Sequence, residues 1–224
     1  MSGRHYATPC VSIFETLWLW CRRVVSIPET YPIGGLTLSH TRIEPLVAPY
    51  DPDVDAQLAK MMPAGAPPIA LFRTFAHNMP MAQAMGGWGS YELSKRLSLS
   101  MRQRELVIDR VTARCGCEYE WGVHVAFFAD RVDLSPDQVK SLTHGAPENA
   151  CWTSEEAILL RAVDELHDNA DLSDETWTSL SRTLSTEQIL DLLLLAGWYH
   201  AISFAANGAR VPLEDGVPRF ADFL

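Results

Sequence analysis

The chain is poor in cysteine and in basic residues, and both shortages exclude classes of protein. Five cysteines are an odd number and too few for a disulfide scaffold, so we expect free thiols in a reducing compartment. Lysine and arginine total 18 against 28 aspartate and glutamate residues, which gives a net charge of -10. An acidic surface repels phosphate backbones, so nucleic acid is not an expected partner.

Long hydrophobic runs are also lacking. The most apolar early stretch, residues 11–27, is interrupted by Glu15, Arg22 and Arg23, whereas a membrane-spanning helix needs roughly 18 or more apolar residues. A basic region is nearly absent before this stretch, and no small-residue cleavage site follows it, so it makes a poor signal peptide. We therefore expect a cytoplasmic protein with no membrane partner.

The composition is that of a folded globular protein. Of 224 residues, 47% are hydrophobic and 21% are charged, enough to bury a core in one domain or two small ones. Residues 1–40 stand apart in their prolines and tryptophans, and Gly34 and Gly35 mark a break. We expect an N-terminal extension over residues 1–40 that docks on the body or on a partner subunit, or lies on a membrane surface. Residues 41–224 form the main domain.

The main domain is predicted to be all-α. Strand signals are scarce, since no Asn-Gly or Asp-Gly hairpin joins two alternating runs. Capping boxes, in which Ser or Thr precedes Gln or Glu by three residues, recur and predict helix starts. They are Ser100 with Gln103, Ser135 with Gln138, Thr153 with Glu156, and Ser185 with Gln188, while Ser173 is a further expected cap.

Two further segments suggest how the helices assemble. Residues 189–198 are apolar on all sides except at Asp191, as in a helix buried centrally or at a subunit interface. We therefore expect a helical bundle that forms a homo-oligomer. The glycine-rich residues 86–91, around Trp88, predict a bend between two helices.

Most of the reactive groups lie in residues 104–128. At about 100° per residue, Cys117, Glu120, Trp121 and His124 share one helical face. Glu105 lies twelve residues before Cys117, roughly 18 Å away on one straight helix. Gly116 can break that helix, so that a second helix begins near Cys117 and folds back, bringing Glu105 toward the other side chains.

This arrangement suggests thiol chemistry with proton transfer. Cys117 at a helix start is placed where the helix dipole stabilises a thiolate nucleophile, and His124, Glu105 and Glu120 can hold and return protons. The alternative is that these residues have no catalytic role: Cys117 is a buried structural residue, His124 has its hydrogen bonds satisfied within the core, and the glutamates are solvated.

Metal binding by the same face is a further alternative, but it requires an additional ligand. His200 or His77 would have to supply that ligand. We expect no metal and no cofactor.

The segment of residues 104–128 resembles the carboxymuconolactone decarboxylase family, which includes the alkylhydroperoxidase D-like proteins. Glu105, Cys117 and His124 stand at the spacing of the peroxidase branch, and Glu120 replaces its second cysteine. The longer members with a Cys-Glu-Tyr-Glu-Trp motif are similar over residues 117–121, and residues 197–208 and 211–214 resemble them too. The resemblance implies an all-α bundle assembled as a dimer, trimer or hexamer.

The resemblance implies two reactions. In the peroxidase branch a cysteine reduces organic hydroperoxides, with Glu and His relaying protons. Because Glu120 replaces the partner cysteine, oxidised Cys117 would need an external thiol, or Cys115 or Cys151, to be reduced. In the decarboxylase branch, His and Glu act on a carboxylated lactone without a redox cysteine pair.

Three hypotheses about function follow. The first is hydroperoxide reduction at Cys117 with an external thiol reductant. The second is a decarboxylase, lyase or isomerase acting on a small lactone or aromatic acid, for which Trp121, Arg110 and Arg114 are candidate substrate-binding residues. The third is a helical oligomer that senses redox state without turnover.

Overall fold

The computed structural model describes residues 40–63 and 65–224, and the regular elements in these ranges are all helical, as predicted. The α-helices are α2 (Pro52–Met61), α3 (Ala70–Phe75), α4 (Met79–Glu92), α5 (Met101–Arg114), α6 (Glu118–Phe128), α7 (Pro136–His144), α8 (Ser154–Asn169), α9 (Asp174–Thr183) and α10 (Thr186–Ala209). Two short 3-10 helices are η1 (Ala129–Val132) and η2 (Phe220–Phe223). The expected extension over residues 1–40 lies, except for its last residue, outside the described part.

The helix starts follow the capping pattern of the sequence. In each of the four predicted boxes the Ser or Thr oxygen accepts from the third backbone N–H, and the Gln or Glu side chain accepts from the cap's own N–H. Ser173 caps α9 in the predicted place. Substituting such a cap by alanine costs about 1 kcal/mol, so these short motifs contribute to setting where each helix begins.

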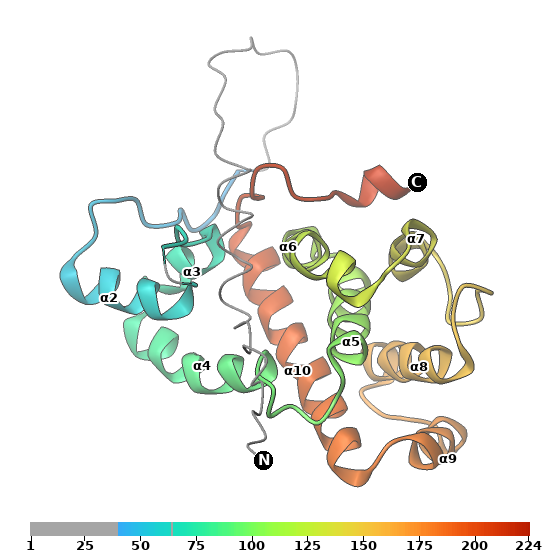
Figure 1. Cartoon of the computed structure of the whole chain (residues 1–224). Coiled ribbons are helices and arrows are strands. Elements are labelled where there is room, and N and C mark those ends of the chain that lie inside the picture. The colour runs from blue at the N-terminus through green and yellow to red at the C-terminus, as the bar shows by residue number, and fades with distance from the viewer. Residues whose placement is uncertain (1–39, 64) are drawn as a thin grey trace, which may run out of the picture.

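Helix α5 lies at the centre of the main bundle. Figure 1 shows it flanked by α6, α8 and α10, while α2, α3 and α4 lie on the other side of α10. Leu106, Val107, Ile108 and Val111 have no exposed surface, and each such burial contributes about 1.5–3 kcal/mol. Buried residues run without interruption from 104 to 112, so four charged side chains are drawn into the interior with them.

Helix α10 is the long apolar helix predicted from its composition. Asp191, its one charge within residues 189–198, accepts hydrogen bonds from Tyr91 and from the backbone and hydroxyl of Ser98. By length and composition α10 is the one helix in residues 40–63 and 65–224 that could cross a membrane, but half of that stretch is buried inside the fold. Its burial against α5, α6 and α9 is that of a core helix.

One face of α10 carries large apolar side chains in the open. Leu190, Leu194 and Phe204 are 56%, 54% and 68% exposed. These positions are spaced so that they fall on one side of the helix. The homo-oligomer expected from the sequence stays a prediction.

The glycine-rich residues 86–91 do not form the bend that was predicted. They continue α4 to its end at Glu92, and the indole of Trp88 stacks on Trp198 of α10 at 5.1 Å between ring centroids. The reason is a close approach, because a Cβ at Gly89 would lie 3.3 Å from the Trp198 ring. The absence of a side chain at Gly89 leaves room for the Trp198 ring.

The C-terminal segment, residues 211–224, closes over α6. The Glu214 carboxylate accepts from the Tyr119 hydroxyl at 2.6 Å, and the backbone N–H of Phe220 donates to Glu118 at 2.7 Å. A Cβ at Gly122 would stand 2.6 Å from the carbonyl oxygen of Pro218. The contact therefore depends on the absence of a side chain at position 122.

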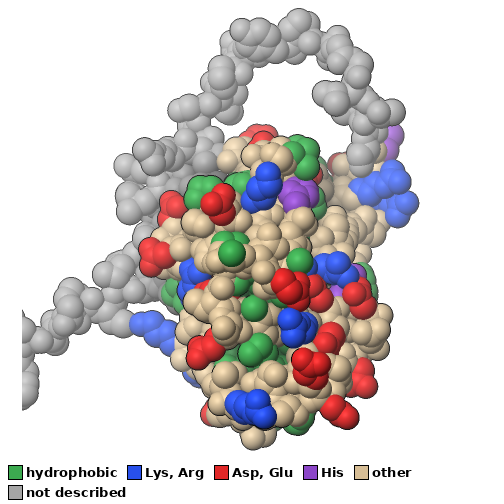
Figure 2. Space-filling model, turned by 90° about the vertical axis from the view of Figure 1, so that its right-hand side faces the viewer, with side chains coloured by type: hydrophobic (Ala, Val, Ile, Leu, Met, Phe, Trp, Pro, Cys, Tyr) green, Lys and Arg blue, Asp and Glu red, His purple; other side chains and the backbone are tan. Residues whose placement is uncertain are grey.

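The surface carries charges of both signs. Figure 2 shows Asp and Glu side chains interspersed with Lys and Arg on the face that lies to the right in Figure 1, with no continuous basic stripe on that face.

Candidate active site

The junction between α5 and α6 forms as the sequence predicts. Gly116 adopts φ +60, the left-handed region that glycine enters without strain. The N–H of Gly116 donates to the carbonyl of Ala113 at 2.9 Å, and that of Cys117 donates to the carbonyl of Thr112 at 2.8 Å. This pair of bonds is a Schellman motif, which ends α5 and lets α6 begin directly at Cys117.

The reversal brings Glu105 against His124. The Nδ1 of His124 donates to Oε2 of Glu105 at 2.8 Å, and its Nε2 lies 3.1 Å from the Tyr199 hydroxyl and 3.5 Å from Oε1 of Glu120. All four side chains are buried. The structure therefore assembles three of the four predicted catalytic residues, Glu105, Glu120 and His124, into one hydrogen-bonded cluster.

His124 is held in its charged form. Burial on its own lowers the pKa of the imidazole, but the carboxylates of Glu105 and Glu120 outweigh it and raise the pKa to about 10. Both ring nitrogens then donate, one to Glu105 and the other toward Tyr199 and Glu120. The cluster thus stores a proton that can be delivered to a reacting atom.

Arg104 and Asp109 belong to the same buried region and were missed in the sequence. The Arg104 guanidinium binds Oε1 of Glu105 at 2.6 Å through Nε and lies over the Phe128 ring at 5.0 Å. Burial and the charge of Glu105 raise the pKa of Asp109 well above its ordinary value. Asp109 follows Glu105 by one helical turn, and that spacing was the available signal.

Cys117, the fourth predicted catalytic residue, is at the N-cap of α6 with no exposed surface. Burial raises the pKa of its thiol to about 11, and the charge of Glu120 adds to the rise. The backbone N–H of Glu120 and the hydroxyl of Ser203 act in the opposite direction. The sequence left open whether the helix start or Glu120 would prevail; burial and Glu120 do, and the resting group is a thiol.

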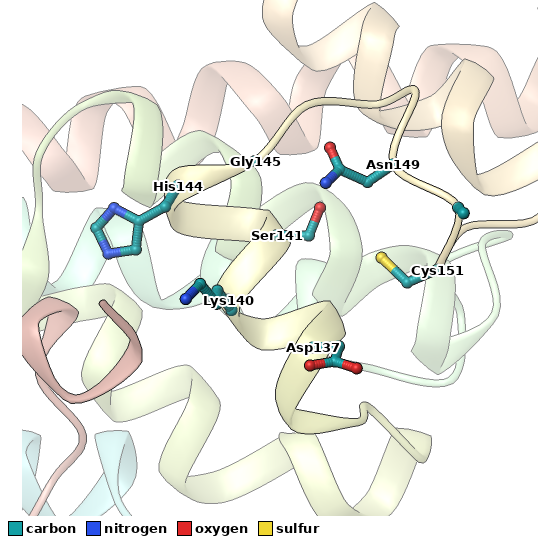
Figure 3. A pocket seen from close by; sticks show the side chains of 8 residues that line it. Asp137, Lys140, Ser141, His144, Gly145, Asn149 and Cys151 are labelled. Atoms are coloured by element: carbon teal, nitrogen blue, oxygen red, sulfur yellow. The ribbon is translucent and has the colours of Figure 1, made fainter.

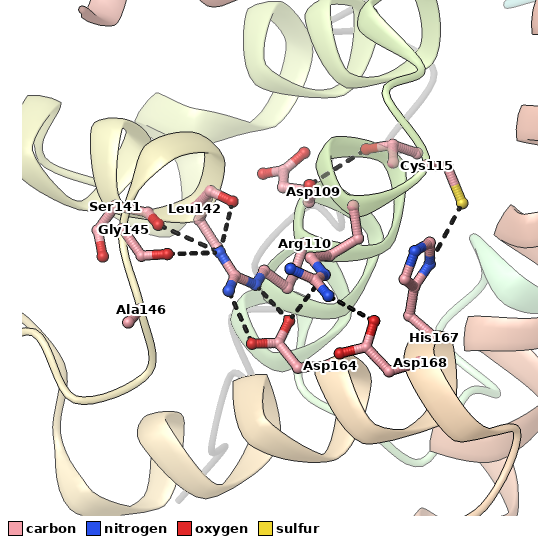
Figure 4. A network of polar contacts seen from close by, with 12 residues as sticks. Asp109, Arg110, Cys115, Ser141, Leu142, Gly145, Ala146, Asp164, His167 and Asp168 are labelled. Atoms are coloured by element: carbon pink, nitrogen blue, oxygen red, sulfur yellow. Dashed lines mark hydrogen bonds and ion pairs between the residues drawn. The ribbon is translucent and has the colours of Figure 1, made fainter.

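Three predicted substrate-binding residues lie elsewhere. Trp121 is fully buried and packs against Phe220 and Phe223 of η2 at 4.9 and 5.6 Å between ring centroids. Figure 4 shows Arg110 directed at Asp164 and at the end of α7, and its Nε and Nη2 each donate to one Asp164 carboxylate oxygen at 2.7 Å.

The two arginines serve the packing of α8. Arg110 also donates to the backbone carbonyls of Leu142 and Gly145, and Arg114 binds Asp168 at 2.5 Å. Their polar contacts in the described part of the chain are thus with α7 and α8 and the turn after α7, and none is with the His124 cluster.

The metal alternative built on Cys117, Glu120 and His124 is not assembled. His77 binds the backbone oxygen of Glu44 at 2.8 Å, and Nε2 of His200 lies 3.0 Å from Nδ1 of His167, so neither completes that set.

Two surface hollows occur apart from the cluster. A hollow of 280 Å³ between α7 and the loop after it is lined by Asp137, Lys140, His144 and Cys151, among others (Figure 3). A second, of 330 Å³, lies between the starts of α5 and α8 and the end of α9, around Arg102 and Glu156. Neither contains Cys117 or His124. Cys151, a candidate partner for oxidised Cys117, therefore faces a different part of the molecule.

Residues 80–164 match the model of the carboxymuconolactone decarboxylase family. Over this segment, the chain is similar to the carboxymuconolactone decarboxylase family. The matched range holds Glu105, Cys117, Glu120 and His124, so the family segment and the buried cluster coincide. Tyr199, which completes the cluster, lies outside it on α10.

Solved structures share the fold of this chain. An uncharacterized peroxidase-related protein from Ralstonia eutropha JMP134, described as an alkylhydroperoxidase AhpD core, is 15% identical with a TM-score of 0.66, over 77% of this chain and 93% of its own. A peroxidase-related protein from Silicibacter sp. TM1040 is 16% identical with a TM-score of 0.64, over 82% and 99%.

The debrominase Bmp8, as a cysteine variant in complex with 2,3,4-tribromopyrrole, is 15% identical with a TM-score of 0.65, over 79% of this chain and 94% of that one. At these identities the likeness establishes the all-α alkylhydroperoxidase D-like fold. No curated protein matches the chain significantly.

Proposed function

We propose that this protein reduces hydroperoxides at Cys117 with electrons from an external thiol. The observation that carries the proposal is the coupling of Cys117 to the His124 cluster through Glu120. The backbone N–H of Glu120 faces the Cys117 sulfur, and its carboxylate lies 3.5 Å from Nε2 of His124. One residue thus connects the nucleophile to the proton donor. The peroxidase-related proteins of the same fold agree with this assignment.

The chemistry needs two proton transfers. Glu120 accepts the thiol proton, and the thiolate of Cys117 attacks the distal oxygen of the hydroperoxide. The O–O bond breaks, the sulfur gains a hydroxyl as a sulfenic acid, and the alkoxide leaves with a proton from His124 as the alcohol. Glu105 and Arg104 touch no reacting atom in this scheme; Glu105 positions the imidazolium and keeps it charged.

The reductant is an external low-molecular-weight or protein thiol. A first thiol condenses with the sulfenic acid to a mixed disulfide and releases water. A second thiol then frees Cys117 and leaves as the external disulfide. An external reductant fits the position of Cys151 in the loop after α7, away from the cluster, and the glutamate at position 120 where the peroxidase branch has its second cysteine.

Full burial of Cys117 limits the size of the hydroperoxide that can reach it. The side chain has no exposed surface, so a hydroperoxide reaches the sulfur only through an opening of the surrounding side chains. We expect hydrogen peroxide and small alkyl hydroperoxides to react faster than bulky aromatic ones.

The test is oxidation of the purified protein by hydrogen peroxide and by tert-butyl and cumene hydroperoxide, followed by mass spectrometry of the cysteine peptides. We expect a sulfenic acid at Cys117 that dithiothreitol reverses, and peroxide turnover that Cys117→Ser abolishes. Cys151→Ser is the matched control and should keep full activity. Full turnover in Cys117→Ser would refute the proposal.

A second candidate is supported by the acid–base cluster itself. Glu105, Glu120, His124 and Tyr199 are joined by hydrogen bonds and ionic contacts in a buried site, and the resting Cys117 is a thiol. In a decarboxylation, the bond to the carboxylate carbon breaks, carbon dioxide leaves, and His124 protonates the carbanion left behind. The substrate would be a small carboxylated lactone or aromatic acid.

The two candidates make opposite predictions for the same pair of variants. A decarboxylase loses release of carbon dioxide in His124→Ala and keeps it in Cys117→Ser. A peroxidase loses peroxide consumption in Cys117→Ser, whether or not an acid substrate is present. Carbon dioxide release from a panel of carboxylated lactones, measured alongside peroxide consumption, separates them.

A further inference from the structure

A second group of reactive side chains lies outside the His124 cluster. Cys115 at the end of α5, His167 in the last turn of α8 and His200 in α10 converge, each half-buried. The sulfur of Cys115 lies 3.8 Å from Nδ1 of His167, and that nitrogen lies 3.0 Å from Nε2 of His200. All three atoms are within 4.8 Å of one another. Figure 4 shows the Cys115 thiol and the His167 ring facing each other.

His200 presents an unprotonated nitrogen to this group. Its Nδ1 donates to the backbone carbonyl of Ala196 at 2.8 Å, so in the neutral ring Nε2 carries the lone pair. Histidines that bind metals usually donate their second nitrogen to a carbonyl or carboxylate in this way, which fixes the ring and its tautomer. His200 is thus oriented as a ligand by its own helix.

The spacing of the three atoms suits a tetrahedral ion. Zinc bonds of about 2.3 Å to sulfur and about 2.0–2.1 Å to nitrogen place two ligand atoms about 3.3–3.6 Å apart. The observed 3.8 and 3.0 Å bracket these values. The remaining pair, Cys115 with His200, lies within 4.8 Å and would close by about 1 Å.

Charged side chains that are already paired lie beside this group. Asp164 of α8 pairs with Arg110 and Arg114, and Asp168 pairs with Arg114. Burial lowers the pKa of His167, as do the neighbouring His200 and Arg114. Burial also raises the pKa of Cys115, whose proton a bound metal would displace.

We propose that Cys115, His167 and His200 form a zinc site, with a water or an exogenous ligand at the fourth position. The three protein ligands come from three helices, so the ion would join α5, α8 and α10 at one point. Binding converts the Cys115 thiol to a zinc-bound thiolate and releases its proton. A bound Cys115 is unavailable to a sulfenic acid on Cys117, which is a second reason for an external reductant in the proposed peroxidase. The zinc site itself does not depend on that activity.

The test uses the full chain, stripped with a chelator and titrated with Zn²⁺ and with Co²⁺. We expect one ion per chain by equilibrium dialysis, a higher melting temperature with Zn²⁺, and a thiolate-to-cobalt charge-transfer band with tetrahedral d–d bands. Cys115→Ser removes the charge-transfer band, and His200→Gln weakens Zn²⁺ binding by more than about 100-fold, above the cost of losing an outer-shell partner.

Two control variants change a cysteine and a histidine outside the proposed zinc site. Cys151→Ser and His144→Gln, which lie at the 280 Å³ hollow, should bind both ions as the wild type does. Circular dichroism of each variant checks that it folds, and His167→Gln is a second ligand variant. Absence of binding in the wild type, or an unchanged cobalt spectrum in Cys115→Ser, would overturn the assignment. Loss of peroxidase activity in Cys117→Ser with an unchanged cobalt spectrum would separate the two proposals.

Discussion

The charge on His124 depends on Glu105, and Glu105→Gln tests this dependence. The amide keeps the size of the side chain but removes the negative charge that binds both His124 and Arg104. Arg104 is 3% exposed and would be left as a buried cation without its partner. Removing one member of a buried ion pair costs about 3–5 kcal/mol. At this chain length that corresponds to a fall in melting temperature of about 6–20 °C.

The same variant changes how stability depends on pH. The pKa of His124 is raised from its ordinary 6.5 to about 10 in the folded protein, so the folded state binds a proton that the unfolded state releases. This contribution is fully present below pH 6.5 and is lost as the pH rises toward 10. One such proton gives a slope of about 1.4 kcal/mol per pH unit, or a few kcal/mol across the window. Glu105→Gln should reduce that slope, because Glu120 alone is then left to oppose the lowering of the His124 pKa by burial.

Urea unfolding followed by tryptophan fluorescence, repeated across this pH window, measures both effects. Glu187→Gln is the matched control, since Glu187 is exposed in the first turn of α10. The wild type and this control should lose stability together as the pH rises, while Glu105→Gln starts lower and changes less. The reasoning fails if Glu105→Gln is as stable as Glu187→Gln, or if all three share one pH slope.

Three further substitutions test the packing around the site. Arg110→Ala removes one side of the partly buried pair with Asp164 and should lower the free energy of unfolding by about 1.5–3 kcal/mol in urea titrations. Gly116→Ala places a Cβ at φ +60 and should cost about 1–2 kcal/mol by thermal unfolding, although no atom obstructs it. Gly122→Ala drives a Cβ toward the Pro218 carbonyl and should cost about 1–3 kcal/mol, with earlier cleavage of the C-terminal segment in limited proteolysis.

Each of these substitutions has a control of the same chemistry. Arg161→Ala breaks an exposed pair with Glu148 and should change stability by at most about 1 kcal/mol. Gly86→Ala and Gly197→Ala add a methyl group in open space on a helix and should be neutral or stabilising by about 0.5–1 kcal/mol. If a variant loses no more stability than its control, the contact assigned to that residue does not stabilise the fold.

Local chemistry carried most of the correct predictions. The capping boxes at Ser100, Ser135, Thr153 and Ser185 act within four residues, so neighbouring side chains contain all the information that places those helix starts. The break at Gly116 is equally local, because a left-handed residue ends a helix whatever surrounds it. That break in turn made the approach of Glu105 to His124 predictable.

The mistaken bend at residues 86–91 shows the limit of this reasoning. Gly89 would loosen an isolated helix, but in α4 the Trp198 ring packs against it. Arg110 and Arg114 looked free to bind a substrate because their partners, Asp164 and Asp168, are about fifty residues away in the chain. Only packing of α8 on α5 brings these charges together.

The sequence by itself determined the helical class, the helix starts, the turn at Gly116 and the family motif, since each depends on spacing within one or two helical turns. The tertiary structure decided the protonation of the reactive groups. Burial from several helices raises the pKa of the Cys117 thiol, and two carboxylates overcome burial at His124. It also decided the convergence of Cys115, His167 and His200, which are separated by 52 and 33 residues. Desolvation and long-range contact are sums over neighbours that only the folded chain supplies.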